Sequence, residues 1–430
     1  MAIAESLTAG VRARLAGLAP ETQAAWKWDI ATGILAGIYQ GCVWTFVARV
    51  ARADLHATYA HMGWIAAAPA LGYVFATVWA RQMDGRSKMP FVFWTWLFAR
   101  GAFMLAPLLH SRAQFVLLVC ATPFVFSVSM PAYTAIMKDI YPDHQRGRLM
   151  SVVRMGMSVM TLIAALTMGR LLDGGLSWKV GFFIGGMVGA MSAVTFSRIR
   201  VPLGDDSIDR MSAHHFFADT VDILRRNPGY RWFTASVFVS GFGNLVATTL
   251  YPIYQVDIFH ITNTQVANMQ NIASLATIGG FFFWGGFLDR RGPLATVLVA
   301  LGFNLAVPLL YAQSWSMTAL YIASGSMGLC VAGIDLAYLN TTLLFAEPGK
   351  AAQYQALHSS FFGIRGSIAP QFAIPLMRTI GYRNAFMTSF TIIGAGVWLQ
   401  MISMRDYRRQ ANDERLERIE ARERELAKVE

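Results

Sequence analysis

The chain has 430 residues, of which 55% are hydrophobic and 14% are charged, whereas a soluble domain carries about 25% charged residues. This composition excludes a water-soluble globular protein. A net charge of +11 would suit a nucleic-acid partner, but the Lys and Arg residues are scattered over short polar intervals between apolar segments. We therefore expect the lipid bilayer as the main partner, and no nucleic acid.

Apolar segments long enough to cross a membrane recur along the chain, since about 20 apolar residues in a helix span a hydrocarbon core of about 30 Å. The cytoplasmic N-terminal segment, residues 1–25, lacks the order of a cleavable signal peptide, and its Arg12 and Arg14 favour a short amphipathic surface helix. We expect an all-α integral membrane protein with twelve transmembrane helices, at residues 26–49, 60–81, 89–110, 113–138, 148–172, 178–198, 230–257, 264–288, 293–312, 315–344, 352–378 and 383–404.

Two polar segments separate or follow these helices. Residues 199–229 form the longest polar interval, and the run FFADTVDILRR within it has helical apolar spacing, which predicts a cytoplasmic linker with one interfacial helix. Residues 405–430 are nearly charge-balanced, with Glu414 and Arg418 at i,i+4 spacing, which predicts a charged cytoplasmic helix. A solvated extension is the simpler interpretation of this tail, and a site for a protein partner is the alternative.

Positive charge is distributed unevenly between alternate loops. With a cytoplasmic N-terminus, the cytoplasmic loops hold most of the Lys and Arg residues that lie between spans. The loops on the opposite side hold far fewer, namely Arg49, Arg52, Arg112, Lys179, Arg378 and Arg383. This asymmetry is what the positive-inside rule predicts for an even number of spans with both termini cytoplasmic. We expect the inner membrane of a bacterium as the location.

Sequence landmarks recur in the same order about 205 residues apart, which indicates an internal repeat. Asp84 in ARQMDGRSKMP corresponds to Asp289 in GGFLDRRGP, and Pro142 corresponds to Pro348. The polar linker falls between the two copies. The sequence therefore predicts two pseudo-symmetric six-helix bundles, at residues 26–198 and 230–404.

The loops that carry the paired aspartates resemble the signature GxxxDRxGR(R/K) of the major facilitator superfamily. The residues of the second copy that fit the signature are Gly285, Asp289, Arg290 and Gly292. In the first copy Asp84 stays in register and Arg86 and Lys88 keep the charge, while other signature positions are replaced by Ala80, Gly85 and Ser87. The resemblance extends over residues 26–404 and identifies no subfamily.

This resemblance implies a secondary transporter that works by alternating access, with its substrate site at the interface of the two bundles near mid-membrane. It also implies that the two aspartates latch the cytoplasmic side, because each would face the positive start of a helix in the other bundle. Ordinary positive-inside charge is the alternative interpretation for the basic residues. The expected cytoplasmic gate consists of Asp84, Arg86, Lys88, Gly285, Asp289, Arg290, Gly292, Arg146 and Arg148.

Charged residues inside the predicted spans are candidates for substrate binding or proton coupling, because a charge at the bilayer centre costs about 2.5 to 3.5 kcal/mol or more. Asp335 near the centre of the tenth span is the first candidate for the coupling group, and a permanent ion pair is its alternative. Arg365 in the eleventh span is the expected partner of Asp335 or of an anion. His358 and Arg154 are further candidates, with snorkelling as the alternative for Arg154.

The remaining intramembrane charges and polar residues have simpler interpretations. Asp29 lies at the start of the first predicted span, where it would cap the helix, and a coupling role is the alternative. Arg100 falls on the third helix, which the family places outside the cavity lining, so a structural role is favoured. Candidates for the cavity lining, with plain packing as the alternative, are Tyr39, Gln40, Tyr133, Asn244, Tyr254, Gln255 and Asn340.

The sequence predicts a transporter rather than an enzyme. No catalytic motif has a suitable context, and Cys42, Cys120 and Cys330 lie in apolar spans without metal-ligand spacing, so we expect no cofactor, metal or disulfide. The excess of buried Arg over acidic residues favours an anionic or zwitterionic substrate. We also expect a monomer and a transport step coupled to protons. A non-transporting receptor or scaffold of the same fold, recruiting a partner through the tail, is the alternative function.

Overall fold

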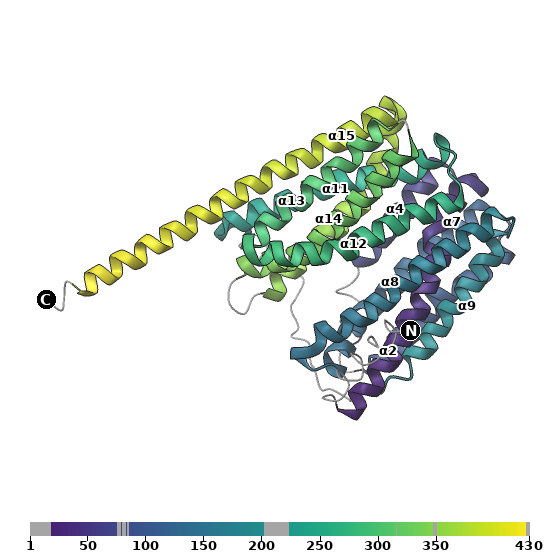
Figure 1. Cartoon of the computed structure of the whole chain (residues 1–430), viewed down its shortest axis with the longest axis horizontal. Coiled ribbons are helices and arrows are strands. Elements are labelled where there is room, and N and C mark those ends of the chain that lie inside the picture. The colour runs from purple at the N-terminus through teal and green to yellow at the C-terminus, as the bar shows by residue number, and fades with distance from the viewer. Residues whose placement is uncertain are drawn as a thin grey trace, which may run out of the picture. The chain divides into compact units, whose positions relative to one another are not determined.

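The computed structural model describes residues 19–74, 79, 83, 86–201, 223–314, 316–346 and 351–426, and every regular element in these ranges is helical (Figure 1). The first long helix joins α2 and α3 through two π-helical stretches. Its parts are α2 (Pro20–Tyr39), η1 (Gln40–Trp44), α3 (Thr45–Arg49) and η2 (Val50–Asp54). The helices that follow are α4 (Tyr59–Val74), α6 (Met89–Gly101) with the 3-10 extension η3 (Ala102–Leu108), α7 (Arg112–Ile140), α8 (Asp143–Asp173), α9 (Trp178–Phe196), α11 (Pro228–Asp257), α12 (Asn263–Arg291), α13 (Pro293–Ala312), α14 (Met317–Phe345) and α15 (Ala351–Leu426).

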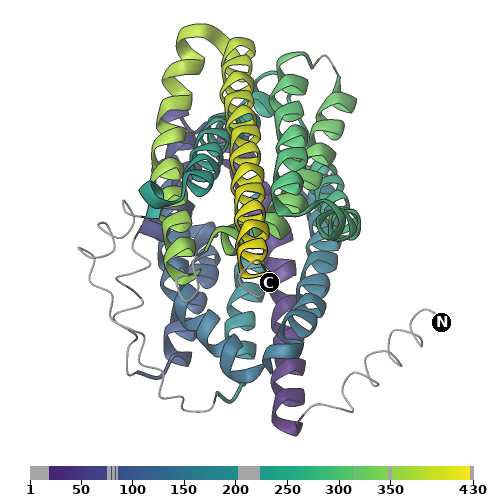
Figure 2. The ribbon, with the colours of Figure 1, turned by 90° about the vertical axis from the view of Figure 1, so that its left-hand side faces the viewer.

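Ten helical segments in the described ranges are long and apolar enough to cross a membrane. The sequence predicts twelve, and two features account for the difference. The second predicted span contains α4, of which 16 residues are described. The eleventh and twelfth spans are both part of α15, whose backbone leaves helical geometry at Gly381 (φ 79°, ψ 169°). Figure 2 shows how α15 turns back on itself, so that its two arms run in opposite directions.

The backbone repeats along the chain as the sequence does. Corresponding helices begin about 205 residues apart, as at Tyr59 and Asn263, Met89 and Pro293, and Arg112 and Met317. Two non-glycine residues adopt positive φ in the described ranges, and they occupy corresponding positions before α4 and α12: His56 (φ 49°) and His260 (φ 48°). The shared backbone geometry at these two turns supports the repeat independently of side-chain identity.

Contacts divide the chain into two compact units that differ slightly from the sequence halves. Unit 1 comprises residues 1–209 and 255–271, and unit 2 comprises residues 210–254 and 272–430. In unit 1, α2 packs against α8 and α9, α6 packs against α7 and α9, and α4 packs against α7. Unit 1 therefore includes the end of α11 and the beginning of α12.

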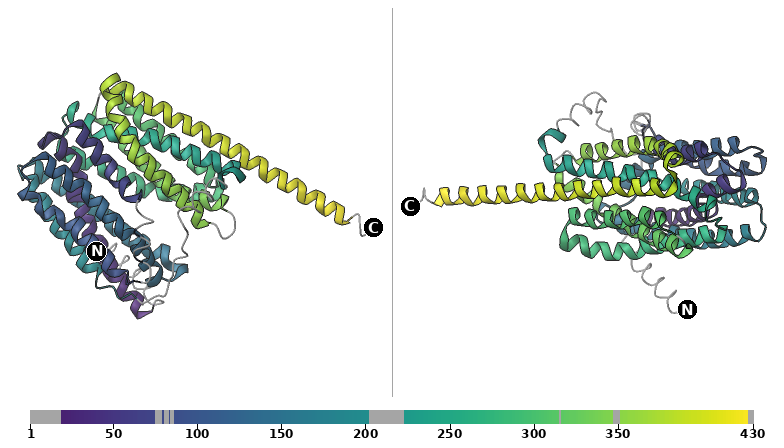
Figure 3. Two further views of the ribbon diagram at one scale, coloured as in Figure 1. Left: turned by 180° about the vertical axis from the view of Figure 1, so that it is seen from behind. Right: turned by 90° about the horizontal axis from the view of Figure 1, so that it is seen from above.

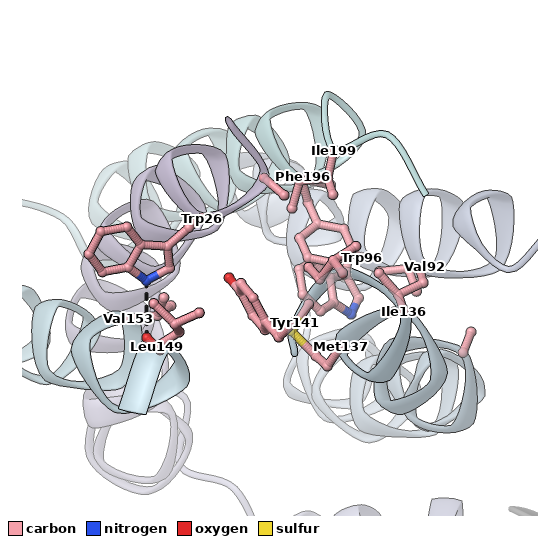
Figure 4. Packing of buried hydrophobic residues seen from close by; sticks show 14 of the residues in the cluster. Trp26, Val92, Trp96, Ile136, Met137, Tyr141, Leu149, Val153, Phe196 and Ile199 are labelled. Atoms are coloured by element: carbon pink, nitrogen blue, oxygen red, sulfur yellow. Dashed lines mark hydrogen bonds between the residues drawn. The ribbon is translucent and has the colours of Figure 1, made fainter. Parts of the chain in front are cut away.

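The core of unit 1 is rich in large aromatic side chains (Figure 4). Trp26 is fully buried and its indole N–H donates to the main-chain carbonyl of Leu149 at 3.1 Å, which joins α2 to α8. Trp96 on α6 packs against Phe196 on α9, with ring centres 4.8 Å apart. Buried indole N–H groups need a partner, and these contacts provide one while filling the space between helices.

Three glycines on the first helix allow it to touch the backbone of α8. A Cβ atom on Gly33 would meet the Val153 side chain, and one on Gly37 or Gly41 would overlap the main-chain oxygen of Met157 or Thr161. The glycines follow one another at i,i+4 spacing, which places them on one face of the helix. In a membrane, close approach of this kind replaces the hydrophobic effect as the source of helix association.

We expect Gly37→Ala to destabilise unit 1, because the new methyl group would displace the α8 backbone at Met157. Overpacking of this kind costs about 1–3 kcal/mol. Gly156→Ala is the matched control, since Gly156 lies on α8 and its Cβ would meet only Ile34 Cγ1 at 3.9 Å. The gain in helix propensity should leave that control as stable as the wild type or more so. Thermal unfolding in detergent checks both, and equal stability of the two variants would contradict the packing described.

Unit 2 has a second aromatic core. In this unit α13 packs against α14 and α15, and Tyr230, Phe233, Phe345 and Tyr354 are buried together. Polar side chains here bond to main-chain groups of neighbouring helices, as when Ser236 Oγ donates to the Gly396 carbonyl at 2.8 Å. Such bonds satisfy polar groups where no water is present.

The second arm of α15 runs unbroken from the membrane-length segment into the charged tail and ends at Leu426. In Figure 3 this yellow helix extends well beyond the other helices of unit 2. Residues 202–222 of the predicted linker and residues 1–18 lie outside the described part of the chain. The interfacial helix predicted in the linker is therefore described only at its end, where residues 223–226 are helical.

Candidate functional site

Arg365 is the most deeply buried cation among the described residues of unit 2. It lies in the first arm of α15, is 6% exposed and donates to the main-chain carbonyl of Val237 on α11. Its guanidinium group lies 5.3 Å from the centre of the Phe362 ring. No carboxylate among the described residues forms an ion pair with Arg365, and its buried Nε has no hydrogen-bond partner there. Within the described part of the chain, the positive charge is thus only partly satisfied.

Gly241 on α11 makes the room that Arg365 occupies. A Cβ atom at Gly241 would overlap the guanidinium carbon and one terminal nitrogen, and would lie 2.7 Å from Nε. A side chain of any other type would therefore displace the guanidinium group. Sequence reasoning did not identify Gly241, because nothing in the sequence pairs a glycine of the seventh span with an arginine of the eleventh.

We predict that Gly241→Ala weakens anion binding about tenfold without removing the charge, because a displaced guanidinium group cannot keep its hydrogen-bond geometry. Gly302→Ala on α13 is the matched control, since no atom lies within 4 Å of the Cβ position there. Titrations with an anion, in which the rise in melting temperature reports binding, compare the affinities of the two variants. Wild-type affinity in Gly241→Ala would show that this position of Arg365 is not needed for binding.

His358 and Tyr338 lie beside Arg365. The His358 ring meets the Tyr338 ring from α14 edge-on, with centres 5.2 Å apart and planes at 77°. Arg365 interacts electrostatically with both side chains. Arg365, His358, Tyr338 and Gly241 thus form one cluster, which we call the Arg365 cluster, built by α11, α14 and α15.

Asp335 lies on α14, one turn before Tyr338, and its side chain is exposed. It forms no ion pair with Arg365, which is turned toward α11 instead. The structure therefore places Arg365 and His358 in one cluster. Asp335, the expected carboxylate partner of Arg365, does not form an ion pair with it. Arg154 lies on α8 in unit 1 and is also exposed.

The interpretation of Asp29 as a helix cap is wrong. The helix begins at Pro20 and its N-cap is Ala19, so Asp29 lies well inside α2. It is 3% exposed and accepts a hydrogen bond from the Tyr141 hydroxyl at 2.7 Å. The apolar run begins at residue 26, whereas the helix begins more than a turn earlier, at Pro20. Tyr141 was not identified from the sequence, since it lies in a loop after the fourth span.

Arg100 is buried in unit 1. It donates to Ser192 Oγ on α9 and stacks over the Trp96 ring at 4.0 Å. Trp96 in turn donates to Ser129 Oγ at 2.9 Å, which links α6, α7 and α9. Tyr133 on α7 packs its ring against Trp96, with centres 5.6 Å apart. This arrangement suits a charge that holds three helices together.

The other cavity candidates are dispersed. The Tyr39 hydroxyl accepts from the Trp44 indole at 2.9 Å, and the exposed residue Gln40 begins the π-helical stretch η1. Asn340 is exposed on α14 and donates to the Leu336 carbonyl at 2.6 Å. The Oδ1 atom of half-buried Asn244 has no partner in the described part of the chain.

Tyr254 and Gln255 lie at the end of α11, where the division between the units falls. Tyr254 belongs to unit 2 and packs in an aromatic cluster with Tyr311, Tyr382 and Phe386. Half-buried Gln255 belongs to unit 1, and its main-chain carbonyl accepts from the N–H of Ile261 at 3.3 Å. These aromatic contacts of Tyr254 agree with plain packing, which is the alternative to a role in lining the cavity.

The residues of the predicted cytoplasmic gate have separate environments. In unit 1, Lys88 forms an ion pair with Asp139 at the end of α7, at 3.6 Å, and Arg146 donates to the carbonyls of Met137, Lys138 and Tyr141. Arg146 thereby satisfies the free carbonyls at the end of α7. Arg86 is exposed, while Asp84 and the side chain of Arg148 lie outside the described residues. Asp139 was missed because it lies at the end of a span rather than in the signature loop.

In unit 2 the gate residues lie where α12 gives way to α13. Gly285 is half-buried within α12, and Asp289 and Arg290 are exposed at its end. Gly292 precedes α13 with φ 79°, a conformation that favours glycine. The signature glycine is therefore explained by the backbone turn between the two helices.

A second polar network joins residues 257–264 to the rest of unit 1. Arg52 forms a two-pronged ion pair with Asp257, at 2.7 and 2.6 Å, and Tyr59 donates to the same carboxylate at 3.1 Å. Arg49 donates to Asn263 Oδ1 at 2.9 Å. We call this set, with Asp173, the Arg52 network.

Asp173 completes the Arg52 network at the start of α12. It accepts from the main-chain N–H groups of Asn263 and Thr264, at 2.9 and 2.8 Å, and thus caps α12 from another helix. In the sequence, these arginines are only members of the smaller set of basic loop residues, which the predicted topology places opposite the cytoplasm. Their partners lie about 205 residues away in sequence, so no local pattern could reveal them.

No group of three or more His, Cys, Asp or Glu residues in the described ranges could hold a metal ion. The Arg365 cluster is suited to bind an anion, since an arginine fork matches a carboxylate or phosphate.

Comparison with known proteins identifies the fold. A family model described as the Major Facilitator Superfamily matches residues 30–370. No curated protein matches the sequence. A mutant of the nucleoside transporter NupG is similar in structure, with a TM-score of 0.72 and 11% identity over 88% of this chain and 99% of that chain. A mutant of the peptide transporter POT has a TM-score of 0.69 and 14% identity over 89% of this chain and 94% of that chain.

A bacterial homolog of the human lysosomal transporter Spinster, in an inward-facing and occupied conformation, has a TM-score of 0.65 and 14% identity. That match covers 90% of this chain and 98% of the other. At these sequence identities, the similarity to the solved structures shows a shared fold. The substrates of those proteins are not assigned to this chain.

Proposed function

The chain belongs to the major facilitator superfamily and is a secondary transporter with many membrane spans, and we propose that it moves a small anionic or zwitterionic solute by alternating access, coupled to protons. The observation that carries this proposal is Arg365, a buried guanidinium group without a carboxylate partner in the described part of the chain. A buried charge is expensive unless it is paired, and a bound anion would supply the pair.

The position of Arg365 supports this assignment. Its side chain lies between α11 and α15 with Tyr338 of α14 nearby, so three helices of unit 2 would surround a ligand there. Gly366 and Pro370 follow on α15, and small residues and prolines permit a helix to approach its neighbours and bend. We infer that the anionic group of the solute binds the Arg365 guanidinium group.

Protons are the proposed coupling ion, and Asp335 is one candidate for the group that carries them. Asp335 is an exposed carboxylate on α14, which can load and release a proton. If Asp335 is that group, Asp335→Asn should transport the solute at a rate that no longer depends on a pH gradient. Unchanged pH dependence would remove Asp335 from the mechanism and leave Asp29 and His358.

We further propose a monomer in the inner membrane of a bacterium, with both termini cytoplasmic. The distribution of basic residues supports this orientation. In this orientation the Arg52 network lies on the outer side, and the signature loops and the C-terminal helix lie on the cytoplasmic side. Asp84 and Asp289 are then the proposed cytoplasmic latches, with the signature resemblance as their support.

A binding screen tests the proposed substrate class. Purified protein is melted in the presence of lactate, sulfate, glutamate, choline or glycerol, which represent anions, a zwitterion with an extra carboxylate, a cation and a neutral solute. A ligand at about 100 times its dissociation constant stabilises the folded state by about 2.7 kcal/mol. We expect an anion or the zwitterion to stabilise the wild type but not Arg365→Gln. Stabilisation of both proteins by the cation or the neutral solute alone would refute the proposed class.

The receptor or scaffold alternative has one supporting feature, the continuous C-terminal helix to Leu426. A protein truncated after Met404 separates the two functions. A transporter should still move its solute without this tail, whereas a scaffold that moves no solute should lose its partner.

A further inference from the structure

His358 is a half-buried titratable group two turns before Arg365 on α15, and the proposed substrate site does not by itself use it. The two residues lie on one face of α15 about two turns, or roughly 10 Å, apart. The His358 ring is held by the Tyr338 ring at 5.2 Å. His358 and Arg365 interact electrostatically, so the protonation of one side chain depends on the charge close to the other.

The groups that interact with His358 lie on two helices, Arg365 on α15 itself and Tyr338 on α14. Tyr354 lies one turn before His358 on α15, and its main-chain carbonyl accepts from the Tyr230 hydroxyl of α11 at 3.0 Å. Asp335 is the nearest acidic position on α14 in sequence, and its side chain is exposed. Within the described ranges, the permanent charge that acts on His358 is therefore the Arg365 cation.

Charge balance links the two side chains. While Arg365 carries its positive charge alone, a second positive charge on His358 is opposed by repulsion in a medium of low dielectric constant. An anion bound to Arg365 cancels that charge, and the imidazole can then accept a proton at lower cost. Binding linkage is reciprocal, so a proton on His358 must strengthen anion binding by the same factor.

We propose that His358 takes up a proton when an anion binds to Arg365, so that the two ions enter the Arg365 cluster together. The anion brings the negative charge, the proton comes from solvent and adds to the unprotonated ring nitrogen of the imidazole, and no bond within the protein breaks. This inference rests on the proposed function, because it requires an anionic ligand at Arg365. It assigns the coupled proton to His358 in place of Asp335.

The test is the pH dependence of anion binding, measured by thermal stabilisation of the full chain in detergent. Lactate, sulfate and glutamate serve as probes, since their acidic groups do not titrate between pH 5.5 and 8. The wild type should bind one of these probes about tenfold more tightly at pH 5.5 than at pH 8, a factor within the usual range of coupling between sites. His358→Gln should bind with an affinity that is the same at both pH values. His110→Gln, which replaces an exposed histidine, is the control and should behave as the wild type.

A second measurement uses only the wild type and so does not depend on the folding of a variant. Addition of the probe to weakly buffered protein at pH 6.5 should remove a fraction of a proton per bound anion from solution, about 0.4 on average for a tenfold change in affinity over 2.5 pH units, as reported by a pH indicator. Binding without proton uptake, or pH dependence that persists in His358→Gln and disappears in Asp335→Asn, would overturn the assignment to His358 and leave the anion site intact. Failure of every probe to bind at any pH would refute the proposed function itself, and this inference with it.

Discussion

Arg365→Met is expected to raise the thermal stability of the empty protein and to abolish anion binding. Arg365 holds a charge that is 6% exposed and lacks a carboxylate partner among the described residues, so its desolvation is poorly repaid. Methionine has a similar length and no charge, and apolar replacements of buried charges are neutral or stabilising by about 1–4 kcal/mol. The opposite signs of the two effects are what a binding residue predicts and a structural residue does not.

The expected loss of affinity follows from the hydrogen bonds that a guanidinium fork makes. Each hydrogen bond to a charged group contributes about 1.5–3 kcal/mol, so two bonds correspond to about 100-fold in affinity or more. Thermal melts of the empty protein and anion titrations measure the two effects separately. Arg383→Met, which removes an exposed arginine from the second arm of α15, should change neither. A destabilised Arg365→Met protein that still binds the anion would show that Arg365 is structural.

Breaking the Arg52 network should release residues 257–271 from the rest of unit 1. The side chains of Arg52 and Asp257 are 18% and 19% exposed, and their two-pronged geometry makes this the strongest type of ion pair. We expect Arg52→Met and Asp257→Asn each to shift the balance between attached and released states by about 1.4 kcal/mol, or tenfold. In a double-mutant cycle the two effects should not add, because either change removes the same pair.

Labelling of a cysteine at position 267 measures that release. Ala267 is fully buried against Gly169 of α8, so Ala267→Cys in a protein without Cys42, Cys120 and Cys330 should react with a maleimide only when the segment opens. Arg52→Met and Asp257→Asn should accelerate labelling about tenfold. Arg112→Met, which removes a weaker and exposed contact to the His56 carbonyl, is the control and should not. Equal labelling rates in all four proteins would mean that the Arg52 network does not hold this segment.

Alternating access gives the Arg52 network its functional interest. Residues 257–264 lie at the junction of the seventh and eighth predicted spans, whereas Arg49, Arg52 and Asp173 belong to the first sequence half. A transporter of this family must break contacts between its sequence halves on one side of the membrane during each cycle. On this account the labelling rate of Ala267→Cys should change when the anion of the binding screen is added.

The architecture could be predicted from the sequence because it depends on features that are local or periodic. Apolar runs of membrane length, loop charge and the aspartate landmarks of the repeat all survive in one sequence, and the match to the superfamily confirms the all-helical membrane fold. The continuous α15 illustrates the limit of that approach. The sequence predicts its charged tail as a separate segment. No helix-breaking residue separates the tail from the last span, and one continuous helix contains both.

The site could be predicted only in part. Burial cost singles out Arg365 and Asp335 from the sequence, because a charge within an apolar run is unusual wherever the helices pack. Partners are set by helix rotation and packing, which a hydropathy pattern does not contain. For that reason Tyr141 beside Asp29, Gly241 beside Arg365 and Asp257 beside Arg52 emerge only from the three-dimensional structure.

Uptake into proteoliposomes tests the central claim, that this transporter carries an anionic solute through Arg365, most directly. The anion that best stabilises the purified protein is supplied outside the vesicles, with and without an inward proton gradient, and its accumulation is followed over time. We predict that the wild type concentrates the anion, that the gradient accelerates uptake, and that Arg365→Met vesicles match empty ones while Arg383→Met vesicles match the wild type. Uptake by Arg365→Met at the wild-type rate, or none by any protein that binds the anion, would contradict this account.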